Sequence, residues 1–334
     1  MTTDVAILDP QRLNTEVLKR AADVLLRGGL VAFPTETVYG LGADAMNPAA
    51  VDRIFEAKGR PATNPTIIHV ADVAGAKACA ADWPEEADEL ANAFWPGPLT
   101  IVVPAASGIA PAALAGGTTV GLRIPNHPVA SALLKAVGKP IAAPSANRSE
   151  SLSPTTAQHV LRTLDGRIDL VLDGGPTPGG LESTVVDLSV SPPRLLRPGL
   201  ISAEQLRWYL PDLKIVLARN PSLIVKSPGL QHRHYAPKTP LELSMNVPKR
   251  RVGDPPLRIG LITFGGNKID DAQIVHRRLP TDAAAAATEL YAMLHELDAM
   301  NLDLILVQPP PPGDDWSAIR DRLQRASTRV DPRD

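Results

Sequence analysis

Lys58 and Arg60 are separated by one glycine and followed by a proline, in a run that comes directly after a predicted helix. The glycine lets the chain turn and the proline stiffens it, so both cations point to the same side. A bidentate guanidinium beside a compact ammonium suits a polyphosphate ligand. The alternative is a solvated helix end, at which basic side chains offset the helix dipole. Taken alone, the spacing favours this second interpretation.

Arg123 is flanked by apolar residues within a predicted strand at 120–124. Arginine is rarely buried without a partner. That partner is either the carboxylate of a ligand or an internal aspartate or glutamate, and the sequence supports the two alternatives about equally.

Hydroxyl, amide or basic side chains also stand at the ends of other predicted strands, where α/β proteins bind ligands. These segments are 34–42 (PTETVYGLG), 142–149 (AAPSANRS), 180–187 (GLESTVVD) and 196–199 (LRPG). The second leads to a helix N-terminus, which favours anions. For the first, the alternative is a turn folded by Gly40 and Gly42, whose threonine hydroxyls satisfy backbone groups. Since neither GxxxxGK[ST] nor GxGxxG occurs, a nucleotide must be held in another way.

Length and composition limit the protein classes that can carry these residues. The chain has 334 residues, about two domains, and a net charge of −2. This charge excludes a protein whose whole surface is basic and binds nucleic acid, but it is compatible with a local basic patch. The single cysteine, Cys79, excludes an internal disulfide and a multi-cysteine zinc site, and is typical of a reducing cytoplasm. With no basic segment at the start and no apolar run of about 18 residues, we expect a cytoplasmic protein without membrane contact.

The order of predicted elements indicates two domains joined by a linker. Short strands mixed with helices over the first 210 residues predict an α/β domain with a mixed sheet, which we assign to residues 1–212. Residues 213–256 are rich in proline and read as a linker. From 257 to 334, a strand–helix–strand–helix order predicts a small parallel α/β domain, with Asp282 capping its first helix. His232 and His234 in the linker favour a surface or lid contact over a zinc site, because further ligands at zinc spacing are not evident.

Taken in order, the segments resemble the YrdC-type L-threonylcarbamoyladenylate synthases in their two-domain form. The resemblance covers residues 13–199 and is carried by the runs 33–42 (FPTETVYGLG), 58–61 (KGRP), 144–147 (PSAN) and 196–199 (LRPG). The run 227–237 (SPGLQHRHYAP) resembles the segment that distinguishes two-domain members. The resemblance implies a YrdC-like twisted mixed sheet with helices, a lid in the linker, and a small Rossmann-like C-terminal domain.

The resemblance also implies a reaction. L-threonine and bicarbonate or CO2 combine to N-carboxythreonine, whose carboxylate attacks the α-phosphorus of ATP, so that threonylcarbamoyl-AMP forms and pyrophosphate leaves. A partner transferase complex then uses this product to modify tRNA, with which a weak direct contact is expected. Because the nucleophile is already anionic, the site mainly has to position two anions and neutralise the leaving pyrophosphate.

Roles for individual residues follow from the resemblance alone. Lys58 and Arg60 are the catalytic cations, assisted by Mg2+, with no metal ligand assigned to the protein. The residues implied to bind ATP are Lys58, Arg60, Asn64, Thr119, Ser145, Asn147, Ser153, Arg197 and, on the lid, Tyr235. Those implied to surround threonine are Thr37, His69, Arg123, Ala143 through its backbone, and Ser183, with Arg123 pairing the substrate carboxylate.

Two other functions remain open at this stage. One is an RNA-binding module on the same fold, which would need a local basic patch. The other is a carbamoyl-adenylate former that serves a different acceptor, as related domains do in hydrogenase maturation. Those proteins carry zinc fingers, which a chain with one cysteine cannot form.

Overall fold

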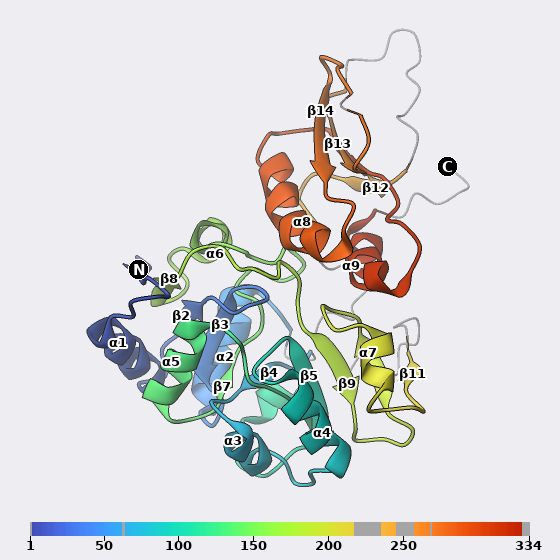
Figure 1. Cartoon of the computed structure of the whole chain (residues 1–334). Coiled ribbons are helices and arrows are strands. Elements are labelled where there is room, and N and C mark those ends of the chain that lie inside the picture. The colour runs from blue at the N-terminus through green and yellow to red at the C-terminus, as the bar shows by residue number, and fades with distance from the viewer. Residues whose placement is uncertain (1, 62–63, 217–234, 245–256, 268, 329–334) are drawn as a thin grey trace. The chain divides into compact units, whose positions relative to one another are not determined.

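The computed structural model describes residues 2–61, 64–216, 235–244, 257–267 and 269–328, which form two compact units (Figure 1). The first unit comprises the described residues up to 149 and those from 153 to 216. The second comprises residues 150–152 and the described residues from 235 onward. A short piece of chain that precedes the linker therefore belongs to the C-terminal unit.

The first unit is built on a mixed sheet of eleven strands among the described residues, in the order β1-β8-β2-β3-β7-β4-β6-β5-β9-β10-β11. In this order the strands are β1 (Asp4–Ile7), β8 (Leu170–Asp173), β2 (Val31–Phe33), β3 (Gly40–Asp44), β7 (Ile141–Ala142), β4 (Ile67–His69), β6 (Thr119–Arg123), β5 (Leu99–Pro104), β9 (Thr184–Asp187), β10 (Arg194–Arg197) and β11 (Lys214–Ile215). The neighbours β4 and β6 are parallel, and so are β5 and β9. The expected mixed α/β architecture is confirmed.

Helices cover both faces of this sheet because its central strands are apolar on both sides. Val31 and Phe33 of β2 join a core cluster with α1 (Thr15–Leu26) and α5 (Pro128–Val137), which pack against each other. Ala32, between them, joins the opposite cluster. This alternation is the period of two that sends successive side chains to opposite faces. The other helical elements of the unit are α2 (Pro48–Lys58), α3 (Val73–Ala78), α4 (Glu85–Phe94), α6 (Ala157–Leu164), α7 (Ala203–Arg207) and the 3-10 turn η1 (Pro111–Leu114).

Helix α2 delivers the two predicted cations, and local signals fix both of its ends. Asn47 accepts a hydrogen bond from the Ala50 amide, and Pro48 occupies the first turn. The helix ends at Lys58 because Gly59 adopts the left-handed conformation, with φ 59°. Lys58 is thus the last helical residue, and Arg60 lies just beyond the turn.

The second unit has a parallel sheet of four strands among its described residues, in the order β12-β15-β13-β14. These are β12 (Leu241–Leu243), β15 (Leu304–Val307), β13 (Ile259–Phe264) and β14 (Ile274–Leu279), with helices α8 (Ala283–Asp298) and α9 (Ser317–Ala326) and the 3-10 turn η3 (Asp314–Trp316). The predicted parallel domain is confirmed, and Asp282 caps α8 through the Ala285 amide. Strands β12 and β14 were not predicted.

Several elements differ from the sequence-based expectation. Strand β1, helix α3 and strand β3 were not predicted. The sequence predicts a helix over residues 154–164, and the corresponding α6 begins only at Ala157. Within the segment 213–256, β11 belongs to the first sheet and β12 to the second, and residues 217–234 and 245–256 lie outside the described residues. Within the described part of the chain, no helix combines the length and apolar character that a membrane span requires.

Candidate functional site

The loop after β2 satisfies its own backbone, as the turn interpretation predicts. The Thr35 hydroxyl donates to the Val38 carbonyl at 2.7 Å and accepts from the amides of Thr37 and Val38. The role expected for Gly40 and Gly42 is wrong, because both lie in β3 rather than in a tight turn. A Cβ on Gly42 would lie 2.9 Å from the Phe33 ring, so close packing of β2 and β3 requires a glycine at this position.

Arg123, the last residue of β6, is buried and has an internal carboxylate partner. Its Nη2 atom lies 2.7 Å from Glu36 Oε1 and donates to the Thr37 hydroxyl at 2.9 Å, and its Nε donates to the Gly97 carbonyl at 3.3 Å. Of the two alternatives left open by the sequence, the structure therefore shows the internal one. Nη1 makes no hydrogen bond to the described residues, so one edge of the guanidinium stays available for a ligand carboxylate.

Glu36 was missed by the sequence analysis, although it stands inside the motif 34–42. Its side chain is 10% exposed, and neither carboxylate oxygen accepts a well-directed hydrogen bond from the described residues. The signal that could have found it is the buried arginine itself, since a buried guanidinium needs a carboxylate nearby.

His69 lies beside Arg123 and is held neutral. The two residues are directly paired in the parallel ladder of β4 and β6, so their side chains share one face of the sheet. Burial, followed by the charge of Arg123, lowers the pKa of His69 to about 3. Its Nδ1 atom is buried and has no hydrogen-bond partner among the described residues. A neutral imidazole with an unused nitrogen is suited to a ligand hydroxyl.

Lys58 is buried, which contradicts the interpretation of a solvated helix end. Its Nζ atom donates to the carbonyls of Ser145 and Asn147, both at 2.6 Å, and the side chain thereby holds the turn that follows β7. Burial, with a smaller contribution from the charge of Arg60, lowers the pKa of Lys58 well below its ordinary value. Among the described residues no carboxylate forms an ion pair with it. A buried cation without a counter-charge favours the arrival of an anion.

Arg60 is also buried, but it is bound to a different part of the chain from Lys58. Its Nη2 atom donates to the carbonyls of Asn64 and Pro65 at 2.8 and 3.0 Å, and its guanidinium lies 5.8 Å from the centre of the Phe55 ring. The two cations thus brace two separate loops, 145–147 and 64–65. Residues 62–63, between Arg60 and Asn64, lie outside the described residues.

A third group of predicted residues gathers at β9 and β10. Arg197 donates from Nε to the Ser183 carbonyl and from Nη2 to the Ser183 hydroxyl, both at 3.1 Å. Ser183 also shares a 2.8 Å hydrogen bond with Thr100 of β5. The Ser153 hydroxyl donates to Glu182, the residue before Ser183. Ser153 and Arg197 are therefore hydrogen-bonded to the adjacent residues Glu182 and Ser183, respectively.

The remaining predicted residues, Thr119, Ala143 and Tyr235, lie on three different segments of the chain. Thr119 begins β6, about 13 Å from Arg123 at the usual rise per residue, and it lies at the end of β6 nearer to Asn64. The amide of Ala143 is occupied by the Ile67 carbonyl at 2.9 Å. Tyr235 lies in the second unit, where Arg322 approaches its ring at 5.0 Å and Tyr291 packs beside it. The rest of the lid run, 227–234, lies outside the described residues.

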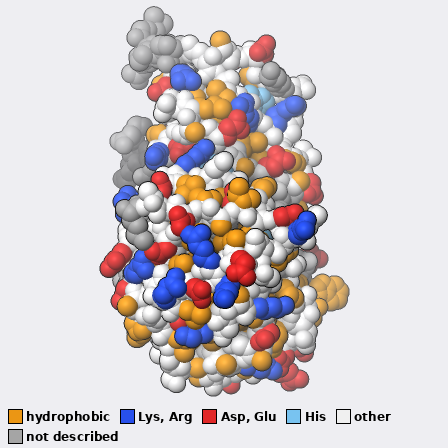
Figure 2. All heavy atoms as spheres, turned by 90° about the vertical axis from the view of Figure 1, so that its left-hand side faces the viewer, with side chains coloured by type: hydrophobic (Ala, Val, Ile, Leu, Met, Phe, Trp, Pro, Cys, Tyr) orange, Lys and Arg blue, Asp and Glu red, His pale blue; other side chains and the backbone are white. Residues whose placement is uncertain are grey.

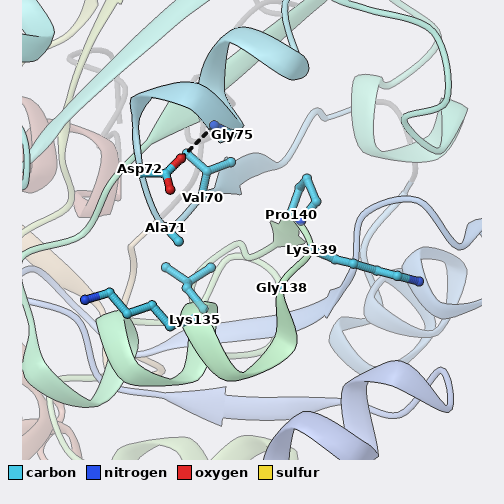
Figure 3. Close-up of a pocket in the computed structure, with 9 residues that line it drawn as sticks. Val70, Ala71, Asp72, Gly75, Lys135, Gly138, Lys139 and Pro140 are labelled. Carbon is cyan, nitrogen blue, oxygen red and sulfur yellow. Dashed lines mark hydrogen bonds between the residues drawn. The ribbon is translucent and has the colours of Figure 1, made fainter.

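A pocket of about 320 Å3 lies elsewhere in the first unit, between the start of α3 and the end of α5 (Figure 3). Its lining includes Asp72, Lys135 and Lys139, and none of the predicted site residues. Lys135 and Lys139 extend in opposite directions, and Lys139 pairs with Asp44 at 3.0 Å. The pocket therefore does not present a converging set of polar groups.

Comparisons with known proteins place these residues in a family. A family model described as "Telomere recombination" matches residues 23–199, and one described as "Threonylcarbamoyl-AMP synthase, C-terminal domain" matches residues 201–328. The chain is 40% identical to the threonylcarbamoyl-AMP synthase of Bacillus subtilis over 97% of this chain and 96% of that protein. It is 39% identical to that of Pyrococcus abyssi, over 95% and 96%.

A solved structure agrees with these matches. The crystal structure of P. abyssi Sua5 complexed with L-threonine superposes with a TM-score of 0.88 at 38% identity, covering 97% of this chain and 98% of that one. The two family models together match residues from both units, and the relatives from B. subtilis and P. abyssi match nearly the whole chain. The chain belongs to the threonylcarbamoyl-AMP synthase family, in its two-domain form.

Proposed function

We propose that this protein condenses L-threonine, bicarbonate or CO2, and ATP into threonylcarbamoyl-AMP and pyrophosphate. The observation that carries the proposal is the group at the carboxyl ends of β4 and β6, where a buried guanidinium with a free edge adjoins a neutral imidazole with an unused nitrogen. Arg123 takes the threonine carboxylate and His69 takes its hydroxyl. Thr37 holds Arg123 in place, and Ser183 and the Ala143 backbone complete the set.

The ATP half of the proposal rests on Lys58 and Arg60. Both are buried and both are held by uncharged carbonyls, so a phosphate would be the first strong anion to reach Lys58. Negative charge from the phosphates would also raise the lowered pKa of Lys58 and so stabilise its ammonium form. We assign Asn64, Thr119, Ser145, Asn147, Ser153 and Arg197 to the nucleotide, together with Tyr235 of the lid.

The chemistry then follows from charge and position. One oxygen of the carbamate of N-carboxythreonine attacks the α-phosphorus, a P–O bond forms, and the bond to the pyrophosphate oxygen breaks with its electrons leaving on pyrophosphate. The nucleophile is already an anion, so the site contributes alignment rather than a base at this step. Lys58 and Arg60 stabilise the charge that develops on the leaving group.

Mg2+ is part of the proposal as a companion of the ATP phosphates. Within the described residues, no three histidine, cysteine, aspartate or glutamate side chains are grouped to hold a metal ion. Magnesium bound to nucleotides takes ligands from phosphates and water, with at most one or two carboxylates. A metal cage built by the described side chains therefore does not fit, and no step above is routed through the ion.

We further propose a division of labour along the chain. Residues 1–212 carry catalysis, the segment 213–256 carries the lid, and residues 257–334 form an accessory domain. The product passes to a transferase complex that modifies tRNA, with at most a weak contact between this chain and tRNA. A cytoplasmic location suits a reaction that consumes ATP and supplies tRNA modification.

The alternative of an RNA-binding module gains no support from the face of the molecule that Figure 2 shows. On the face of the molecule in Figure 2, lysine and arginine side chains of the described residues are interspersed with acidic ones, without a continuous basic area. Binding of RNA through its phosphates would need such an area.

Pyrophosphate release tests the proposed function. The purified protein with ATP and Mg2+ should release pyrophosphate only when threonine and bicarbonate are both present. Lys58→Ala should abolish this release, whereas Lys19→Ala, on an exposed position of α1, should leave it unchanged. Absence of threonine-dependent pyrophosphate in the wild-type protein would refute the proposal.

A further inference from the structure

Glu36 is a buried carboxylate with unused capacity to accept hydrogen bonds. The residue is 8% exposed, and both of its carboxylate oxygens are buried without a well-directed hydrogen bond from the described residues. An ionised carboxylate offers about four acceptor positions, and leaving them empty in a buried site costs free energy. Such a group is suited to a ligand that brings its own N–H donors.

The surroundings hold Glu36 in position. Its own carbonyl accepts from the Gly179 amide at 2.8 Å, and a Cβ on Gly179 would lie 2.5 Å from that oxygen, so the close approach requires a glycine. Among the described residues, the charged or titratable groups that face its side chain are Arg123, at 2.7 Å, and His127. His127 is buried and its Nδ1 accepts from the Val129 amide, so this ring also has a structural role as the cap of α5.

The distances within an amino acid connect Arg123 to Glu36. In any α-amino acid the nitrogen and the carboxylate carbon are separated by two bonds, about 2.5 Å from standard bond lengths and angles. A carboxylate seated on the free edge of Arg123 therefore brings its own ammonium close to the carboxylate that already touches the same guanidinium. Arg123 and Glu36 together form a pair of opposite charges that matches a zwitterion.

We propose that Glu36 binds the α-ammonium group of threonine and removes the proton that must leave before the nitrogen can react. This inference rests on the proposed function and deepens it, because it concerns the formation of N-carboxythreonine rather than the attack on ATP. An ammonium has no lone pair, so no C–N bond forms until it is deprotonated. Glu36 is a catalytic residue in this step.

The step balances with bicarbonate as the co-reactant. One N–H bond of the ammonium breaks and its proton passes to Glu36. The nitrogen lone pair then forms a bond to the bicarbonate carbon, a C–O bond breaks, and a second proton from nitrogen leaves with that oxygen as water. One ammonium, one bicarbonate and one carboxylate thus give one carbamate, one water and one carboxylic acid, which later returns its proton to solvent.

The proposed binding of the threonine ammonium group by Glu36 is tested by comparing ligands with and without an amino group. Affinities of wild-type protein and Glu36→Gln are measured by calorimetry for L-threonine and for (R)-3-hydroxybutyrate, which lacks only the amino group. Both ligands carry the carboxylate that Arg123 would bind. The ratio of their affinities is therefore insensitive to an indirect effect of the substitution on Arg123. Loss of a charge-assisted hydrogen bond predicts that the preference for threonine falls about tenfold to hundredfold. Glu89→Gln, on an exposed position of α4, is the matched control.

The outcomes separate this inference from the proposed function. A wild-type protein that does not bind threonine contradicts the proposed function. A wild-type protein that binds threonine, together with a Glu36→Gln variant whose preference is unchanged within twofold, contradicts the role of Glu36 alone. Where 3-hydroxybutyrate binds too weakly to titrate, its inhibition constant in the pyrophosphate assay replaces the affinity. If Glu36→Gln does not fold, Glu36→Asp keeps the charge and should show the same selective loss.

The proposed proton transfer to Glu36 is tested separately, by kcat and its dependence on pH. At saturating threonine, kcat of Glu36→Gln should fall at least tenfold at pH 7 and should rise more steeply with pH than that of the wild-type protein, because solvent then deprotonates the amine. An unchanged kcat with an altered preference would overturn proton transfer and leave Glu36 as a binding residue.

Discussion

Two regions of the first unit bury a cation in different ways. At the carboxyl ends of β4 and β6, Arg123 is buried against Glu36, and the two charges neutralise each other. At the end of α2, Lys58 is buried against two backbone carbonyls, and the described residues give it no carboxylate. The first arrangement is a balanced pair and the second leaves a net positive charge.

This difference teaches what each region is prepared to receive. A balanced pair beside a neutral imidazole suits a ligand that is itself neutral overall but carries separated charges, as a zwitterion does. A net buried cation suits an anion, because only an anion offsets its desolvation. Under the proposed function, the two regions would therefore distinguish an amino acid from a triphosphate by their charge balance.

Arg123→Met should break the balanced pair and cause the largest loss of stability. Removing one partner leaves the Glu36 charge buried and uncompensated, which typically costs about 3–5 kcal/mol of unfolding free energy. Urea denaturation measures the loss. The double variant Arg123→Met with Glu36→Gln should recover more than half of it, and a double variant as unstable as the single one would show that the pair is not the cause.

In the other region, Lys58→Met should lower activity strongly and change the stability of the protein only slightly. If Lys58 stabilises the leaving group as we propose, its loss should lower the rate of pyrophosphate release about 10²- to 10³-fold. The unfolding free energy should change by only about 1 kcal/mol, because two hydrogen bonds are lost while the desolvation cost of the ammonium disappears. A destabilisation as large as that of Arg123→Met would mean that the two regions do not differ in this way.

The sequence led to most of these residues because they occupy the ends of strands, and strand ends meet at a sheet edge. Arg123 and His69 are brought together by the register of β4 and β6. Arg197 of β10 reaches Ser183, the residue before β9, because β9 and β10 pair in an antiparallel ladder. Short apolar runs and helix caps located most of these elements. The family resemblance added residue roles that spacing alone could not distinguish from ordinary turns.

What the sequence could not supply was the partner of each buried charge. Many glutamates are available to Arg123, and only the tertiary fold brings Glu36 to it. The partners of Lys58 are backbone carbonyls, which have no side-chain signature at all. Strand β3 was missed because Gly40 and Gly42 indicate a turn, whereas packing against Phe33 is what excludes larger side chains. Strand β14 was missed because His276, Arg277 and Arg278 interrupt its apolar pattern.

The smallest predicted effect concerns the neutral state of His69, which should contribute to the pH dependence of the unfolding free energy. Its pKa in the folded protein is about 3, against an ordinary value near 6.5, so the unfolded chain binds a proton that the folded chain does not between these pH values. Stability is therefore lost as pH falls from 6.5 towards 3, by at most about 1.4 kcal/mol per pH unit from this residue. His69→Gln should remove that part of the slope, which urea unfolding at several pH values between 4 and 7.5 measures. An identical slope in the variant would show that the imidazole is protonated beside Arg123, and the neutral acceptor required for a ligand hydroxyl would then be absent.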